Sequence, residues 1–206
     1  MKRMIWLVLL TMALPMAAFA KTSVDFTNDG GSLTGSTAGL SLTGSTLIAI
    51  NGYNGLGLQT GILGTLTFST GALTSGSIQM GATFAAGGTF TITGNGSVTG
   101  IPNGVIFSGD FSGTVTWTMV TLANGTHNYT LSGPLSGTEW INGRSINVNG
   151  ATIQLTVNTG KGYFNGLTNI SSGDTNISTV PEPGSLALLG TGLVGLAGAL
   201  ARRKRA

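Results

Sequence analysis

Residues Val105–Met119 read VIFSGDFSGTVTWTM and alternate more clearly than any other run in the chain. The odd positions are apolar or glycine, and the even positions from Ser108 onward are Ser, Asp or Thr. Because successive side chains of a strand point to opposite faces, this pattern predicts a strand with one buried and one solvated face. Gly109 and Gly113 interrupt the apolar face and predict a bulge or bend in the middle of the run.

The same alternation extends on both sides of this run. Between Lys21 and Phe164 it is punctuated by Gly and Asn, with turn signals about every ten residues. The pattern predicts an all-β fold, an antiparallel β-sandwich or barrel-like domain, over residues 21–164. Residues 165–180 lose the alternation and are predicted to form a linker. No segment before Val180 shows a convincing helical period after residue 20.

A first Asn-Gly pair, Asn149–Gly150, is predicted to form a two-residue type I′ hairpin loop. That loop pairs Val148 with Ala151 and Ile146 with Ile153, so that apolar side chains meet apolar ones. The pattern of faces is therefore consistent with the turn signal.

A second pair, Asn124–Gly125, is predicted to sit in a longer loop. A two-residue loop there would mix the apolar and polar faces, because a slip of one residue inverts every side chain. A longer loop pairs Met119 with Leu131 and places Trp117 over Gly133.

The composition narrows the functional classes. Only 7% of the 206 residues are charged, 41% are hydrophobic and 35 are glycine, which is too hydrophobic for simple disorder. Between residues 21 and 180, three basic residues against five acidic ones leave a net charge of −2. Nucleic-acid binding needs clustered cations and is therefore excluded. With no cysteine, the chain has no disulfide framework, thiolate metal site or thiol nucleophile.

The first twenty residues predict a signal peptide. Lys2 and Arg3 form a charged start, an apolar run follows, and Ala18 and Ala20 flank Phe19 as a small-x-small cleavage site. The apolar run is too short to span a bilayer comfortably, and Pro15 follows it directly. Cleavage after Ala20 would leave the β domain exported.

The last 26 residues have three parts. Residues 181–183 contain two prolines, which prevent a helix from continuing through them. Residues 185–201 carry no charge and predict a helix that rises roughly 26 Å, enough to span a bilayer with local thinning. Residues 202–206 form a basic tail, which the positive-inside rule keeps in the cytoplasm. The residues that carry these signals are Pro181, Glu182 and Pro183 in the motif and Arg202, Arg203, Lys204 and Arg205 in the tail.

This order of motif, apolar helix and basic cluster over residues 181–206 resembles the PEP-CTERM sorting signal. The resemblance implies processing by an exosortase, a membrane-embedded protease or transpeptidase of Gram-negative bacteria that make exopolysaccharide. It also implies an intermediate anchored in the inner membrane, followed by display at the cell surface or in the extracellular matrix of a biofilm. The domains that precede such signals vary, so the tail does not identify the activity of the β domain.

The β domain offers few residues for catalysis. His127 is its sole histidine, and Asp110 and Glu139 are the carboxylates that a Ser-His-Asp triad would use, but no Gly-x-Ser-x-Gly elbow is present. The stretch DFTNDG at Asp25–Gly30 resembles a calcium loop, yet Ser36 stands where the bidentate glutamate belongs. We therefore expect no catalytic, cofactor-binding or metal-binding residues.

These observations predict a non-enzymatic exported protein whose partners are an exosortase and, transiently, the inner membrane. The first alternative is a carbohydrate-binding module or adhesin, in which Trp140 and Tyr163 stack on the sugar rings of an exopolysaccharide. The second is a secreted hydrolase, which needs a carboxylate pair or a triad.

Overall fold

The computed structural model describes residues 22–179. The predicted signal peptide, PEP motif, membrane helix and basic tail lie outside the described residues. Within the described range, no helix is both long and apolar enough to cross a membrane. The chain forms antiparallel strands and one short 3-10 turn, Tyr53–Gly55, so the predicted all-β class is confirmed.

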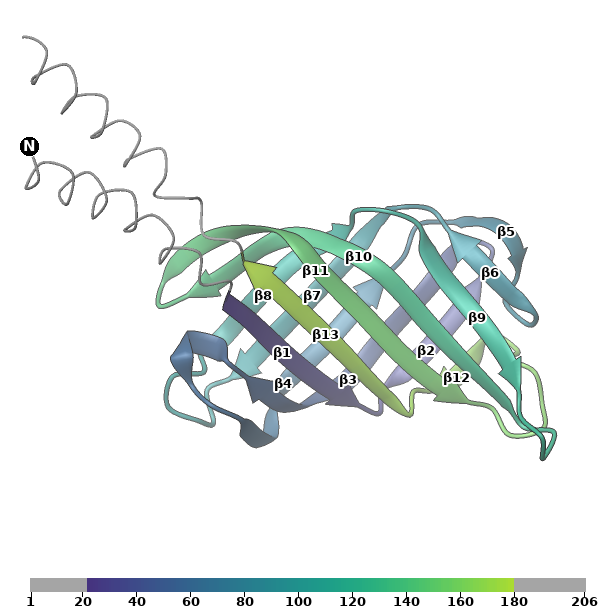
Figure 1. The fold of residues 1–206 in the computed structure, drawn as a ribbon, viewed down its shortest axis with the longest axis horizontal. Helices are drawn as coiled ribbons and strands as arrows, with labels where there is room; N and C mark the ends of the chain where they lie inside the picture. The colour runs from purple at the N-terminus through teal and green to yellow at the C-terminus, as the bar shows by residue number, and fades with distance from the viewer. Residues whose placement is uncertain (1–21, 180–206) are drawn as a thin grey trace, which may run out of the picture. The chain divides into compact units, whose positions relative to one another are not determined.

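Thirteen strands follow one another along the chain (Figure 1). They are β1 (Thr22–Asp29), β2 (Ser32–Ser36), β3 (Gly39–Asn51), β4 (Gln59–Ser69), β5 (Leu73–Ser77), β6 (Gly81–Phe84), β7 (Gly87–Asn95), β8 (Asn103–Phe111), β9 (Val115–Thr121), β10 (His127–Ile141), β11 (Arg144–Asn158), β12 (Leu167–Asn169) and β13 (Ser172–Thr179).

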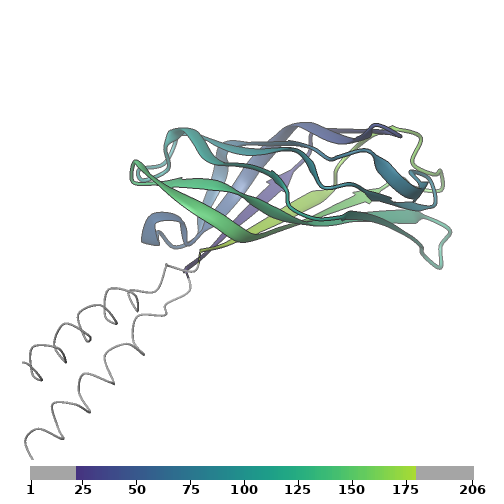
Figure 2. The same ribbon diagram turned by 90° about the horizontal axis from the view of Figure 1, so that it is seen from above.

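Eight of these strands close into a ring, so the fold is a barrel rather than a sandwich. Around the ring the order is β11, β13, β1, β3, β4, β7, β8, β10 and back to β11. The remaining strands extend this ring: β9, β6 and β5 continue from β10, and β2 pairs with β3 and β12. Figure 2 shows the strands enclosing the interior from both sides.

The run Val105–Met119 becomes β8 and β9, which lie along the same edge of β10. Glu139 of β10 pairs with Phe107 of β8, and Ser132 of β10 pairs with Thr116 of β9. Between the two strands the chain leaves the ladder at residues 112–114, which include Gly113. The predicted break is therefore confirmed at Gly113 but not at Gly109, which stays paired with Gly137. The predicted faces are wrong at the start of the run, where a register shift against β7 leaves Val105 exposed and Ile106 buried.

The strands alternate in direction, so the connections gather at two ends of the barrel. The mouth end carries the β3–β4 loop (52–58), the β7–β8 loop (96–102) and the β10–β11 turn (142–143). The far end carries the turns 37–38, 78–80 and 122–126 and the loop 159–166. β1 starts and β13 ends at the mouth end, so the described chain enters and leaves the barrel there (Figure 1).

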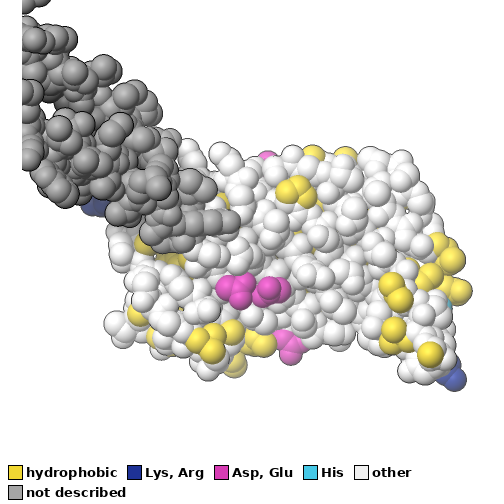
Figure 3. Space-filling view, viewed as in Figure 1, with side chains coloured by type: hydrophobic (Ala, Val, Ile, Leu, Met, Phe, Trp, Pro, Cys, Tyr) yellow, Lys and Arg dark blue, Asp and Glu magenta, His cyan; other side chains and the backbone are white. Residues whose placement is uncertain are grey.

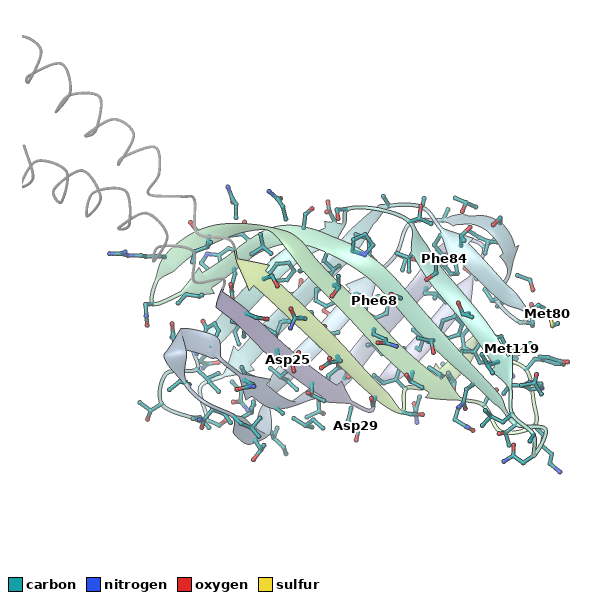
Figure 4. The ribbon with its side chains drawn as sticks, in the orientation of Figure 1. Asp25, Asp29, Phe68, Met80, Phe84 and Met119 are labelled. Atoms are coloured by element: carbon teal, nitrogen blue, oxygen red, sulfur yellow. The ribbon has the colours of Figure 1, made fainter. Side chains whose placement is uncertain are left out.

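Aromatic rings fill the interior. Phe68 of β4 points inward and stacks on Phe90 of β7, with ring centroids 6.2 Å apart, and Phe111 of β8 meets Phe68 edge-on at 5.8 Å (Figure 4). Threonines occupy the alternate positions on the outer face, where Thr67 pairs with Thr91. The Thr-rich composition thus supplies the polar outer surface of the barrel.

The loop after β9 is longer than two residues, as predicted, but the register between β9 and β10 is shifted by two residues. The loop spans residues 122–126, and Met119 pairs with Tyr129 rather than with Leu131. Trp117 stacks on Tyr129 with centroids 5.0 Å apart. The apolar face is preserved because both registers pair residues of the same parity.

Gly133 is covered by a different aromatic side chain from the predicted Trp117. A Cβ atom at Gly133 would lie 2.9 Å from the Phe111 ring and 3.1 Å from Val115. Glycine is therefore required opposite these inward side chains.

The predicted hairpin at Asn149–Gly150 is wrong. β11 runs through both residues, which form a bulge opposite Ser136, because Leu135 pairs with Ala151 and Gly137 pairs with Val148. The turn lies instead at Asn142–Gly143, where φ is 52° and 73°. Asn-Gly suits both a type I′ turn and a bulge, and the dipeptide alone does not distinguish them.

The predicted linker 165–180 is also corrected, because β12 and β13 occupy it and the domain extends to Thr179. The inward positions of β13 are Gly173, Thr175 and Ile177, all buried. Only one of these three is a large apolar residue, so the alternation is present without a hydrophobic signal. β13 is the strand that closes the ring against β1.

A chain that ends at Phe164 lacks β12 and β13, and its ring stays open between β11 and β1. We expect it to lose cooperative thermal unfolding, measured by circular dichroism, because the inward apolar side chains of β11 and β1 become exposed. A chain that ends at Thr179 retains the closing strand and is expected to unfold in one transition. Equal cooperativity of the two chains would show that closure is not required.

Candidate functional site

The mouth end buries a carboxyl group. Glu139 lies on β10 between Phe107 of β8 and Ile146 of β11, its two paired neighbours, and has 0% of its surface exposed. Neither carboxyl oxygen has a hydrogen-bond partner among the described residues. Burial raises the pKa of Glu139 to about 7, because the charged form loses its hydration and gains no partner.

Tyr53 lies beside Glu139 and covers the interior at the mouth end. It sits in the 3-10 turn of the β3–β4 loop, is 1% exposed, and its ring centroid lies 6.4 Å from that of Phe26. Its hydroxyl donates to the backbone carbonyl of Trp140. Burial, and then the charge of Glu139, raise the pKa of the Tyr53 hydroxyl. The two titratable groups are therefore electrostatic neighbours.

A cleft of about 510 Å³ borders Tyr53 but not Glu139, and lies between the β3–β4 loop, the β7–β8 loop and the β10–β11 turn. Its walls combine aromatic groups with amides: Tyr53, Trp140, Asn54, Asn103 and Asn142. Asn54 donates to the carbonyl of Gly100 at 3.1 Å and ties the two loops together. The Asn54 side-chain oxygen is buried without a partner among the described residues.

The triad residues are not brought together. His127 begins β10 and Glu139 lies twelve residues further along that strand, roughly 40 Å away at about 3.3 Å per residue. Asp110 pairs with Ser136 and accepts its hydroxyl at 3.2 Å. His127 hydrogen-bonds the Thr121 hydroxyl at 2.9 Å, and its ring stacks on Tyr163. The histidine thus serves the packing of the far end.

The calcium-loop resemblance is not realised either. Asp25 and Asp29 both belong to β1, in extended backbone rather than in a loop (Figure 4). Asp174 of β13 lies near Asp25, and burial together with that neighbouring charge raises the pKa of Asp174 against the hydrogen bond from Thr27. Figure 3 shows acidic side chains on this open face of the barrel. Among the described residues, no group of three potential ligands could hold a metal ion.

The aromatic residues considered for sugar stacking lie at opposite ends of the barrel. Trp140 is half-buried at the mouth end, and Tyr163 is exposed at the far end on His127. Tyr163 belongs to a set of exposed apolar side chains there, which appears as yellow patches in Figure 3 and includes Met80, Val120, Leu122 and Leu167. A single sugar site therefore uses one of the two aromatics, and the cleft favours Trp140.

Sequence reasoning missed the pairing of Glu139 with Tyr53. One signal was present, because Glu139 has the same odd parity as the inward residues Leu131 and Leu135 of β10. That parity predicts an inward carboxyl, but the approach of the β3–β4 loop has no local signature. The sorting, cleavage and basic-tail residues named above lie outside the described residues.

The comparisons with known proteins concern the tail. The model of the PEP-CTERM protein-sorting motif matches residues 179–205, which confirms the resemblance. Neither curated proteins nor solved structures gave a match.

The free energy of unfolding is expected to depend on pH through Glu139. Because its folded-state pKa is about 7 and its ordinary value is 4.5, the folded protein keeps a proton that the unfolded chain releases between these pH values. The contribution of Glu139 to the free energy of unfolding is therefore complete below pH 4.5. It is lost as the pH rises through 7, which lowers that free energy by up to about 3 kcal/mol. In Glu139→Gln this decrease should vanish in urea titrations, whereas Asp110→Asn should retain it. A decrease that persists in Glu139→Gln would assign it to other groups.

Proposed function

We propose that this protein is a non-enzymatic component of the cell surface or extracellular matrix of a Gram-negative bacterium that produces exopolysaccharide. The observation that carries the proposal is the match of residues 179–205 to the PEP-CTERM protein-sorting motif. That motif implies an exported protein, sorted by an exosortase at the membrane. The β domain is then the part that the sorting system delivers.

The arrangement of the chain is compatible with delivery of an intact barrel. The closing strand β13 ends at Thr179, and the motif begins at Pro181. Removal of the tail beyond Pro181 leaves every strand of the ring in place. A separate linker between domain and motif is therefore unnecessary.

The non-enzymatic role is supported by the scatter of the reactive groups. His127 lies at the far end, Glu139 at the mouth end and Asp110 near the C-terminal end of β8. The neighbouring carboxylates Asp25 and Asp174 lie on an open sheet face, where the substrate of a glycosidase would not be enclosed. A polar, threonine-rich surface with exposed apolar patches suits adhesion to other matrix components.

Tail processing tests the sorting part of the proposal. We expect the mature protein to lack residues beyond the PEP motif when an active exosortase is present, as measured by intact-mass spectrometry of cell fractions. Replacing Pro181, Glu182 and Pro183 with alanine should retain the full tail mass and the membrane fraction, because the recognition motif is lost. Pro134→Ala, a matched proline change in the barrel, should be processed normally. Normal processing of the triple variant would contradict the proposal.

Carbohydrate binding at the mouth cleft is the second candidate. The observation that favours it is the combination of Trp140 with the amides of Asn54, Asn103 and Asn142 around one cleft. An aromatic face packs against the apolar face of a sugar ring, and amides hydrogen-bond its hydroxyls. This candidate specifies how the exported domain would be held in the matrix.

Matched aromatic variants test this candidate on purified exopolysaccharide. Trp140→Ala should weaken binding about tenfold, which corresponds to about 1.4 kcal/mol. The Tyr53 hydroxyl keeps its acceptor in this variant, because that acceptor is the backbone carbonyl of residue 140. Tyr163→Ala at the far end should bind like the wild type in the same titration calorimetry. Equal binding by all three proteins would remove the mouth cleft as the sugar site.

A further inference from the structure

The mouth end combines a buried carboxyl group, which has no hydrogen-bond partner among residues 22–179, with a loop that two side-chain hydrogen bonds tie to neighbouring segments. We infer that Glu139 acts as the trigger of a pH-responsive gate, in which its ionisation releases the Tyr53 loop (52–58) and opens the barrel interior to the cleft. This inference is independent of the proposed surface role, because it concerns the conformation of the domain alone.

The first step is the cost of a charge at this position. The residues that pair with Glu139 on both adjacent strands, Phe107 and Ile146, are apolar. The titratable group that faces it is Tyr53 in the β3–β4 loop, which carries no positive charge. Arg144, the cation on the same hairpin, is exposed and pairs with Ile141 instead. A neutral carboxyl is tolerated in these surroundings, whereas an ionised one requires water.

The second step identifies the element that moves when Glu139 ionises. β10 is paired on both sides at Glu139, so moving that residue would break the ladders to β8 and β11 together. The Tyr53 loop is held more weakly at its tip, by the hydroxyl bond to Trp140 and the Asn54 bond to Gly100. Tyr53 and Leu56 of the loop pack against the core, but no strand ladder includes the loop, so it can move without breaking strand pairing.

The third step is what opening exposes. Tyr53 is almost fully buried and borders both Glu139 and the cleft of about 510 Å³. When Tyr53 lifts, water from the cleft reaches the carboxylate and hydrates it. The pKa of Glu139, about 7, places this transition near neutral pH. The mouth is closed below this pH and open above it.

Hydrogen exchange of the full-length chain tests the gate, with results expressed as protection factors to remove the intrinsic pH dependence of exchange. In the wild type, residues 52–58 should lose protection at least tenfold between pH 5.5 and pH 8.5, while residues 64–69 of the core stay protected. In Glu139→Gln the loop should remain protected at both pH values. The exposed-acid control Asp110→Asn should behave like the wild type.

Tyr53→Phe provides a second variant, which keeps the ring and removes the hydroxyl bond to Trp140. Its loop should already be less protected at pH 5.5 than the wild-type loop. The inference is overturned if the wild-type loop is equally protected at both pH values, as would occur if the Tyr53 hydroxyl turned to the carboxylate instead of leaving. It is also overturned if Glu139→Gln keeps the loss of protection, or if Tyr53→Phe is as protected as the wild type at pH 5.5.

Discussion

Closure of an eight-stranded ring leaves an interior just wide enough for side chains, and the rest of this structure depends on that limit. Phenylalanine, tryptophan and tyrosine fill the space, so the positions that they face must be small. Gly133 lies under Phe111, and a Cβ atom at Gly35 would come within 2.7 Å of the Phe164 ring. The high glycine content of the chain therefore has a packing role as well as a role in turns.

Ring closure also requires the last strand of the domain, β13, to pair with the first strand, β1. Ser23 of β1 donates a hydrogen bond to Asn176 of β13 across 153 residues of sequence. Contacts between residues so far apart in sequence form slowly during folding, because closing the long loop between them costs chain entropy before the pairing stabilises the fold. The ring is thus complete only when the residues directly ahead of the sorting motif have joined it. The closing strand therefore lies directly before the sorting motif in the chain and contains none of the residues Pro181–Pro183.

The buried polar groups of the barrel fall into two kinds. Asn28 donates to the Ser45 hydroxyl at 2.7 Å, and Ser45 donates to the carbonyl of Asp29, so this group supports the seam beside β13. Glu139 has no such partner among the described residues, although β10 is paired there with both β8 and β11. The Asn28 side-chain oxygen and the Thr175 hydroxyl at this seam are also buried without a partner among the described residues, but neither group ionises near neutral pH. The capacity of Glu139 to ionise, rather than an unsatisfied polar atom as such, therefore distinguishes the mouth end from the seam.

Local sequence pattern determined the β class, the inward and outward faces and the sorting tail. The alternation through Val115, Trp117 and Met119 depends only on the two-residue period of a strand, and the tail signal depends on the order of its three parts. Register, closure and the neighbours of Glu139 were decided by the tertiary structure, because pairing partners lie far apart in sequence. β13 shows the limit most clearly, since a Cβ atom at its buried Gly173 would lie 2.5 Å from the Asn28 side-chain oxygen, a neighbour that the local sequence does not reveal.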